Sequence, residues 1–251
     1  MANILTSTES GIRYIFLNRP EKRNALSDGL ISGLKSALVA ADADTTLRAV
    51  VIRGNGTDFC SGADLTSLQT ISENSFDDNF EDAMKLAHLF AQIRNVRVPV
   101  IAAVHGRALA GGCGLATACD LVVATKTASF GYPEVRIGFV PAIVAAILRR
   151  NLPEKRSFEL LTQGFEFNAG EALQIGLVNR VFDEVGFDEA VSDYVSVYSR
   201  VSRSAVHMTK KLLYEIDGHD FSSALQMGAE VNAKARMTED CKKGLARFLK
   251  K

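Results

Sequence analysis

Three short apolar runs, each followed by a glycine or a polar turn, place the tightest constraint on how this chain can fold. They occupy positions 49–53 (AVVIR), 99–104 (PVIAAV) and 120–124 (DLVVA). Runs of this length without alternating polar residues are typical of strands buried on both faces of a parallel sheet. Helical segments separate them, and such alternation implies right-handed crossovers. The sequence therefore predicts an α/β fold with a mainly parallel sheet.

Two segments have the spacing of amphipathic helices. In the first, Ser27 can cap the helix, Asp28 favours its positive end, and apolar residues recur every three or four positions at Leu30, Ile31, Leu34, Ala37, Leu38 and Ala41. In the second, residues 76–94, the common face consists of Phe80, Ala83, Met84, Ala87, Phe90 and Ile93. Further strands are predicted at 12–17 and 177–182.

The character of the chain changes near its last quarter. With 251 residues, the chain is long enough for one large domain with an appendage. Residues 187–251 indicate helices almost throughout, punctuated by Gly186 and Gly218. We therefore expect a core of residues 1–186 and a helical region of residues 187–251 that packs on the core or on a neighbouring subunit.

Charge and composition exclude several classes of protein. Lys plus Arg and Asp plus Glu both total 29, so the net charge offers no general attraction for nucleic acid or an anionic membrane. No stretch approaches the roughly 18 apolar residues of a membrane helix, and no leader-like segment begins the chain, so we expect a cytoplasmic location. The four cysteines form no CxxC pair and the histidines do not sit beside them at metal-ligand spacings. Free thiols and no metal site are therefore expected.

Two loops carry residues suited to chemistry, at 59–65 (FCSGADL) and 106–120 (GRALAGGCGLATACD). The second contains Gly111, Gly112 and Gly114 at a predicted helix start, although glycine costs a helix about 1 kcal/mol relative to alanine. Unpaired amides at a helix N-terminus carry partial positive charge that suits a developing oxyanion. One amide from each loop could hold a carbonyl oxygen. The alternative, that the glycines only permit close packing, stays open.

The second loop has the spacing neither of a P-loop nor of a dinucleotide-binding loop. Cys60 and Cys113 flank the proposed pocket, and we interpret both as packing residues because no histidine near them in the sequence suggests an activated thiolate. His105 precedes the second loop, and a structural role at a strand end is favoured for it.

Five segments in order resemble the motifs of the crotonase (enoyl-CoA hydratase/isomerase) family. They are NRPEKRNAL, FCSGADL, PVIAAVHGRALAGGCGLATACDLVVAT, FGYPEVRIGFVP and EALQIGLVNRVF, and the tail EDCKKGLARFLKK resembles the family's C-terminal helix. The resemblance implies a spiral of repeated ββα units, with terminal helices that form a homotrimer or a dimer of trimers. It implies an acyl-CoA substrate, with coenzyme A as part of that substrate and no separate cofactor.

The resemblance also implies site residues. The amides of Ala63 and Gly111 would form the oxyanion hole, and Glu134 would be the acid and base. The residues implied for binding coenzyme A and substrate are Lys22, Arg23, Ala25, Leu26, Ala63, Asp64, Leu65, Gly111, Phe248 and Lys251. A solvated surface role for the basic residues stays open. Many family members carry a lysine where this chain has Leu65-Thr66, so its phosphate contacts are expected to differ.

The reaction depends on how many acids the site holds. Family hydratases use two glutamates, and this chain retains Glu134 but has Gly114 at the other position. One base suffices to shift a double bond through a dienolate, whereas adding water also needs an oriented nucleophile. Double-bond isomerisation is therefore favoured. Ala142 stands where dienoyl-CoA isomerases and a dehalogenase carry an aspartate, so those two activities are disfavoured.

Three other functions stay open. Hydration would be restored if an acid from 73–82 entered the pocket, although most of those carboxylates are expected on the surface. Decarboxylation of an acyl-CoA and a noncatalytic acyl-CoA-binding scaffold are the others.

Burial beside Phe130, Tyr132 and Phe139 would raise the pKa of Glu134. The alternative role for Glu134 is an ion pair with Arg136 or Arg107.

Overall fold

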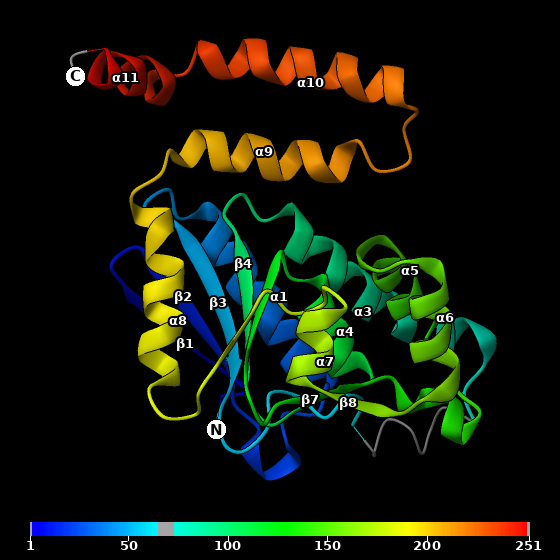
Figure 1. Ribbon diagram of the computed structural model, residues 1–251. Helices are drawn as coiled ribbons and strands as arrows, with labels where there is room; N and C mark the ends of the chain where they lie inside the picture. Colours follow the sequence, from blue (N-terminus) through cyan, green and yellow to red (C-terminus); the bar gives the residue numbers. More distant parts are fainter. Residues whose placement is uncertain (1, 65–72, 250–251) are drawn as a thin grey trace.

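The computed structural model describes residues 2–64 and 73–249, whose strands form two sheets (Figure 1). The larger sheet has six strands in the order β1-β2-β3-β4-β6-β9. These strands are β1 Ile4–Glu9, β2 Ile12–Leu17, β3 Ala49–Gly54, β4 Val100–Val104, β6 Leu121–Thr125 and β9 Arg180–Phe182. Every neighbouring pair is parallel except β1 and β2. The predicted α/β fold with a mainly parallel sheet is confirmed.

Strand β1 has no counterpart among the predicted strands. It lies at the edge of the sheet, and from Leu5 onward its residues are exposed. An edge strand with so little burial needs no apolar alternation, and its sequence ILTSTE shows none. A strand was predicted at 177–182, but only residues 180–182 form β9 and pair with β6.

None of the strands of the smaller sheet was predicted from the sequence. It consists of β5 Arg107–Leu109, β7 Ser129–Gly131 and β8 Glu166–Asn168, in that order. Strands of three residues are too short to give a periodic signal. This sheet matters for the site because β5 runs into the glycine-rich helix and β7 into the segment that carries Glu134.

Helices cover both faces of the larger sheet. One face carries α1 Asp28–Ala43, α3 Phe76–Asn95 and α4 Gly111–Ala118, followed along the chain by α5 Ala142–Asn151, α6 Glu154–Gln163 and α7 Ala169–Gln174. The other face packs against α8 Phe187–Ser196. In β3, Val50 and Ile52 face the first layer while Ala49 and Val51 face α8. Burial on both sides explains the unbroken apolar run.

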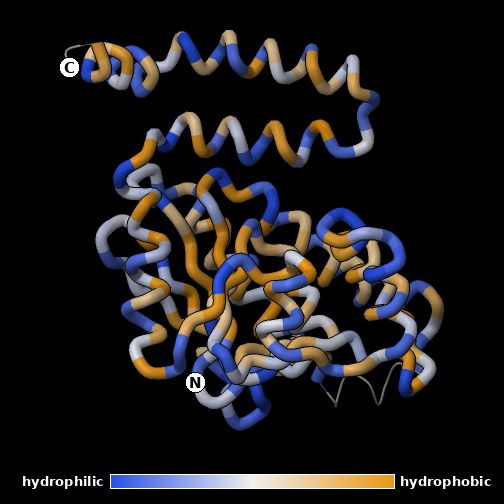
Figure 2. The backbone as a smooth tube through the Cα atoms, in the orientation of Figure 1, coloured by the Kyte–Doolittle hydropathy of each residue, from blue (hydrophilic) through white to orange (hydrophobic). Residues whose placement is uncertain are grey.

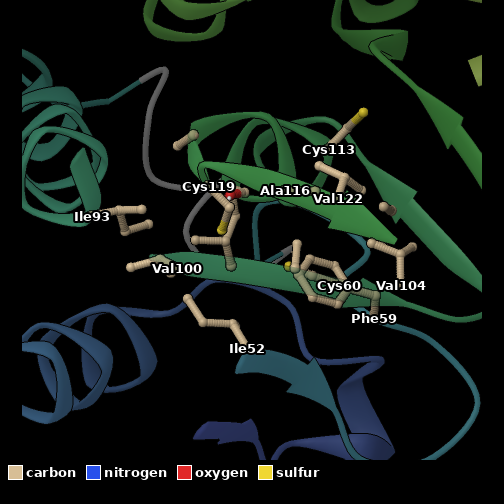
Figure 3. Close-up of a cluster of buried hydrophobic side chains, with 14 of the residues drawn as sticks. Ile52, Phe59, Cys60, Ile93, Val100, Val104, Cys113, Ala116, Cys119 and Val122 are labelled. Atoms are coloured by element: carbon tan, nitrogen blue, oxygen red, sulfur yellow. Dashed lines mark hydrogen bonds between the residues drawn. The ribbon is translucent and has the colours of Figure 1, made fainter. Parts of the chain in front are cut away.

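The main core lies between the sheet and the first helical layer. Figure 3 shows part of it, with side chains from β3, β4 and β6 beside residues of the 59–60 loop and of α4. The predicted cap of α1 is present, since Ser27 Oγ accepts from the Leu30 NH at 3.3 Å. On α3, Phe90 and Ile93 are buried as expected, but Phe80 is exposed and stacks on the exposed Phe76, with ring centroids 6.1 Å apart.

The helices predicted after position 187 are confirmed. They are α8, α9 Arg203–Glu215, α10 Phe221–Arg236 and α11 Glu239–Phe248, with a 3₁₀ turn at Val197–Ser199. In Figure 1, α10 lies beyond α9 on the side away from the sheet, and Figure 2 shows apolar residues recurring along it. Neither α10 nor α11 has a buried residue. Within the described ranges, no helix combines the length and hydropathy of a membrane span.

Helix α9 is tied to the core by a buried ion pair. Lys210 Nζ lies 2.7 Å from Asp120 Oδ2 and also donates to the carbonyl oxygens of Ile93 and Val98 at 3.2 and 3.1 Å. Tyr214 Oη donates to Asp120 Oδ1 at 2.5 Å. Burial lowers the pKa of Lys210, and the facing Asp120 carboxylate opposes that shift. Helix α9 is therefore fixed to the C-terminal end of α3 and to the residues just before β4 and β6.

Candidate active site

Residues 59–64 lie between two neighbouring segments and form hydrogen bonds with both. On one side, Cys60 donates to the Arg107 carbonyl and accepts from the Leu109 NH, each at 3.0 Å. On the other side, Leu26 donates to the Gly62 carbonyl at 2.7 Å and accepts from the Asp64 NH at 3.3 Å. These bonds extend the pairing of β5 across the loop to the 23–26 segment.

The same bonds set the direction of the Ala63 NH. The Gly62 carbonyl and the Ala63 NH belong to one trans peptide group and therefore point in opposite directions. Since that carbonyl points to Leu26, the Ala63 NH points away from Leu26. This is the side on which the loop contacts the residues that follow β5.

Gly111 begins α4 on that side. Its NH is one of the first amides of the helix, which have no acceptor within the helix. A Cβ added to Gly62 would lie 3.6 Å from Gly111 N and 2.8 Å from Ala110 Cβ, so the two loops are in contact at this point. Within residues 2–64 and 73–249, neither the Ala63 NH nor the Gly111 NH has a hydrogen-bond acceptor. Their role as an oxyanion hole stays a prediction.

The residue before α4 has a strained backbone that hydrogen bonds hold in place. Ala110, the residue before the helix, has φ 49° and ψ −127°, a conformation that L-residues adopt at a cost of order 1–3 kcal/mol. Its NH donates to the Gly131 carbonyl of β7 at 2.8 Å, and its carbonyl accepts from the Gly114 NH at 2.9 Å. The surrounding sheet therefore fixes the direction of the Gly111 amide.

Glu134 lies in a short 3₁₀ helix, Pro133–Ile137, that follows β7. Its Oε2 atom is buried and has no hydrogen-bond partner among the described residues. Burial raises the pKa of Glu134, the direction expected from the sequence. Phe130 and Tyr132 are buried, but Phe139, expected to bury the carboxylate with them, is 44% exposed because it follows the Gly138 turn.

The alternative ion pairs of Glu134 do not form in the part of the chain that the structure describes. Arg107 instead binds Asp58, with Nε to Oδ1 at 2.9 Å and Nη2 to Oδ2 at 3.0 Å. Arg136 has no carboxylate within ion-pair distance among those residues. Glu134 is thus a partly buried acid without a described charged partner, which is the environment that perturbs acids toward proton transfer.

The two cysteines near the site are buried thiols. Burial raises the pKa of Cys60 and of Cys113 to about 12, so both are protonated at neutral pH. Thr117 Oγ1 donates to the Cys113 carbonyl at 2.8 Å and lies 2.8 Å from Tyr132 Oη. This network joins α4 to the residue that precedes the Glu134 segment. His105 Nε2 lies 2.9 Å from the Gly56 carbonyl, a contact consistent with a structural role.

The surroundings of Gly114 are apolar and closed. A Cβ at this position would lie 2.6 Å from Val144 Cγ2 and 3.1 Å from Phe90 Cζ. Val144 and Phe90 are themselves buried. The face of α4 where the family resemblance implies a second glutamate in hydratases is therefore occupied by hydrocarbon.

The acidic residues of the 73–82 segment lie on the surface, as predicted for most of them. The exposed carboxylates are Glu73, Asp77, Asp78, Glu81 and Asp82. Asp78 forms a capping box with Ser75, and Asp82 lies 3.5 Å from Lys85 Nζ. None of them is placed as a second buried acid.

The segment predicted to bind coenzyme A is a tight turn held by one buried side chain. Arg23 and Asn24 have φ of 49° and 55°, and Asn24 Nδ2 donates to the carbonyls of Asn55 and Asp58 at 2.9 and 2.8 Å. Lys22 and Arg23 are exposed. The NH groups of Ala25 and Leu26 are used within the chain, so only their carbonyls retain capacity for a ligand.

No local pattern in the sequence indicates Arg19, which links this turn to the loop of residues 62–64. Its Nη1 lies 2.8 Å from Asp64 Oδ2 and donates to the Ala25 carbonyl at 2.8 Å. Asp64, predicted to contact substrate, is buried in this ion pair. Phe248 is exposed on the outer helix α11, far along the tail, while Leu65 and Lys251 lie outside the described residues. The binding roles of these three residues stay predictions.

Comparison with known proteins decides the family. A sequence model described as enoyl-CoA hydratase/isomerase matches residues 7–251, nearly the whole chain. The chain belongs to the enoyl-CoA hydratase/isomerase family. The resemblance read from the motifs is confirmed, and with it an enzyme family that acts on coenzyme A thioesters.

Relatives within the enoyl-CoA hydratase/isomerase family cover the chain from end to end. A Thermus thermophilus protein whose name assigns it provisionally to the enoyl-CoA hydratases is 38% identical over 248 residues, 98% of each chain. The human mitochondrial enoyl-CoA hydratase domain-containing protein 3 is 34% identical and covers 96% of this chain and 79% of that protein. The crystal structure of an enoyl-CoA hydratase from Mycobacterium smegmatis superposes with a TM-score of 0.94 at 33% identity, over 99% of this chain and 96% of that one. The predicted crotonase fold is confirmed.

Proposed function

We propose that this family member isomerises the double bond of an enoyl-CoA thioester. The observation that carries the proposal is the filled space at Gly114, where Val144 and Phe90 leave no room for a second acid. Glu134 remains as a partly buried carboxylate with a raised pKa. One base and an oxyanion hole suffice for moving a proton between two carbons.

The proposed oxyanion hole stabilises the charge that proton removal creates. The thioester oxygen accepts hydrogen bonds from the NH groups of Ala63 and Gly111. When a proton leaves C2 of a 3-enoyl thioester, the electron pair of the C–H bond delocalises onto this oxygen and gives a dienolate. Each such donor is worth about 2.7–4 kcal/mol of transition-state stabilisation in comparable sites.

The proposed base carries the proton between the two carbons. Glu134 takes the proton from C2, and the same carboxyl then delivers a proton to C4, which leaves the double bond between C2 and C3. The raised pKa of Glu134 suits this role, because a carboxyl acting as both base and acid works best when its pKa lies near the working pH. The apolar side chains around Gly114 offer no polar group that would orient a competing water.

Hydration is the second candidate, and the names of relatives favour it, since those quoted above all refer to enoyl-CoA hydratases. It would require Glu134 both to orient a water and to manage its protons. The described carboxylates of the 73–82 segment are exposed and supply no second acid. Isomerisation therefore needs only the one acid that the described site contains, whereas hydration would need a further group to orient the water.

The remaining parts of the proposal concern binding and assembly. Coenzyme A is proposed to lie along the 22–26 turn, where Lys22 and Arg23 are exposed and can meet phosphates. A homotrimer or dimer of trimers is proposed because α10 and α11 expose large apolar residues, among them Phe221, Leu225 and Phe248. We further propose that no cofactor beyond the coenzyme A of the substrate is needed, and a cytoplasmic location stays a prediction. Within the described residues, no cluster of His, Cys, Asp and Glu could hold a metal.

Assaying 3-hexenoyl-CoA isomerisation and crotonyl-CoA hydration side by side tests the proposal. We expect isomerisation to be faster than hydration, and we expect the Glu134→Gln substitution to abolish isomerisation. Faster hydration would replace the isomerase with a hydratase, and full activity in the Gln variant would remove Glu134 from the mechanism. Turnover of a malonyl-type thioester alone would indicate a decarboxylase, and no turnover of any thioester would favour a binding scaffold.

A further inference from the structure

Two groups of the proposed mechanism are linked to helices that pack against each other, α4 and α5. Gly111 begins α4, and Glu134 precedes α5 by a short connection. That connection is braced, since the Phe139 NH donates to the Glu134 carbonyl at 3.0 Å and the Ala142 NH to the Val140 carbonyl at 2.7 Å. A shift of α5 relative to α4 is therefore transmitted to Glu134.

Gly114 and Val144 form a close contact between α4 and α5. Gly114 lies one turn after Gly111, and Val144 lies in the first turn of α5. A Cβ on Gly114 would lie 2.6 Å from Val144 Cγ2, well inside the 3.5–4.0 Å at which two carbon atoms attract best. Val144 is buried and, being β-branched in a helix, has one strongly preferred rotamer, so it cannot turn away.

We propose that Gly114 and Val144 are positioning residues whose contact sets the distance between the Gly111 amide and the Glu134 carboxylate. The inference rests on the proposed function and deepens it, because only a base and an oxyanion hole at fixed separation can share one thioester. A methyl group at position 114 pushes α5 away by about 1 Å to restore van der Waals separation. A misplacement of that size in an active site costs about a hundredfold in rate.

The test uses four variants and a reaction simpler than isomerisation. Gly114→Ala adds the methyl, Gly114→Ala with Val144→Ala makes room for it, and Val144→Ala alone removes the contact. Gly228→Ala on α10 is the matched control, because no heavy atom lies within 4 Å of the added Cβ within the chain. Deuterium uptake from D₂O at C2 of the bound thioester is followed by NMR. In that exchange the C2 proton passes to Glu134 and a deuteron from the solvent-exchanged carboxyl returns.

We expect Gly114→Ala to lower kcat for exchange about a hundredfold at nearly unchanged KM. The double variant should recover to within about fivefold of the parent, and Gly228→Ala should match the parent. A merely structural role would instead lower stability while leaving kcat per folded molecule unchanged. Unchanged kcat in Gly114→Ala, or no recovery in the double variant, would overturn the inference.

If Gly114→Ala does not fold, Val144→Ala decides. It adds no atoms and should lower kcat several-fold at unchanged KM, while an unchanged kcat would overturn the inference. Exchange without isomerisation in the parent enzyme would refute the proposed reaction and leave the positioning inference standing. Absence of exchange in the parent would contradict both.

Discussion

Leu26 donates its backbone NH to the carbonyl oxygen of Gly62 at 2.7 Å, and this hydrogen bond orients the next amide along the chain. Because the peptide group is trans, the Ala63 NH points the opposite way, toward the side where α4 begins with Gly111. A residue of the proposed coenzyme A segment thus orients a residue of the proposed oxyanion hole.

Arg19→Met should destabilise the protein strongly. The Arg19 and Asp64 side chains are 16% and 8% exposed, so the substitution removes a buried charge that faces a buried carboxylate. Breaking a buried ion pair from one side costs about 3–5 kcal/mol, and we expect the free energy of unfolding in urea to fall by that amount. The loop carrying Ala63 also loses its tie to Ala25, so kcat/KM should fall.

The matched control for this prediction is Arg149→Met. Arg149 pairs with Glu154, but their side chains are 54% and 79% exposed. Exposed pairs contribute about 0–1 kcal/mol, so this variant should unfold at nearly the parental urea concentration. Equal destabilisation by the two substitutions would show that burial of the Arg19 pair has no special effect.

Glu134 should make activity and stability respond to pH in opposite directions. Its native pKa is raised by burial, so both states are protonated below the ordinary carboxyl value of about 4.3 and Glu134 has no effect on stability there. As pH rises through the window up to the raised native pKa, ionisation is harder in the native state and stability falls. Over that window kcat should rise as the base forms.

The variant Glu134→Gln tests the predicted pH dependence of both stability and kcat. Its melting temperature should equal that of the parent at the acidic end and exceed it increasingly as pH rises, because the amide cannot ionise. Its kcat should be close to background at every pH. A melting temperature below the parental one at neutral pH would mean that the Glu134 carboxylate is stabilised by a partner.

Most of the larger sheet can be predicted from the sequence, because residues such as Val50, Ile52 and Val123 are buried by contacts that leave a local apolar run. The smaller sheet cannot, because its pairings join residues 107–109, 129–131 and 166–168, which are far apart in sequence and only three residues long. The motifs named Ala63, Gly111 and Glu134. They could not reveal Arg19 or Val144, whose roles depend on contacts with distant residues that no local pattern encodes.

Lys210→Met should loosen the tail from the core. The substitution removes the charged partner of Asp120, which keeps its hydrogen bond from Tyr214, and it leaves the carbonyls of Ile93 and Val98 without the Lys210 donor. We expect a loss of about 3–5 kcal/mol in the free energy of unfolding, with faster hydrogen exchange in α9. The neighbouring Lys211, whose side chain is 62% exposed, gives the control, and Lys211→Met should change stability by less than about 1 kcal/mol.

The backbone amide of Gly111 can be removed without removing the helix. Gly111 is the first residue of α4, a position where proline is tolerated because that NH has no acceptor within the helix. Gly111→Ala is the matched variant, since it keeps the NH while its Cβ meets Leu26 Cδ1 at 3.1 Å, the end of a flexible side chain. Comparing the two variants separates loss of the NH from added bulk.

The most direct test of the account is therefore kcat for thioester isomerisation in Gly111→Pro relative to Gly111→Ala, with circular dichroism to show that both are folded. Because Gly111→Pro lacks one oxyanion donor, its kcat should be about a hundredfold to a thousandfold lower than that of Gly111→Ala. Equal kcat values in the two folded variants would contradict the account, because the Gly111 amide would then take no part in stabilising the enolate.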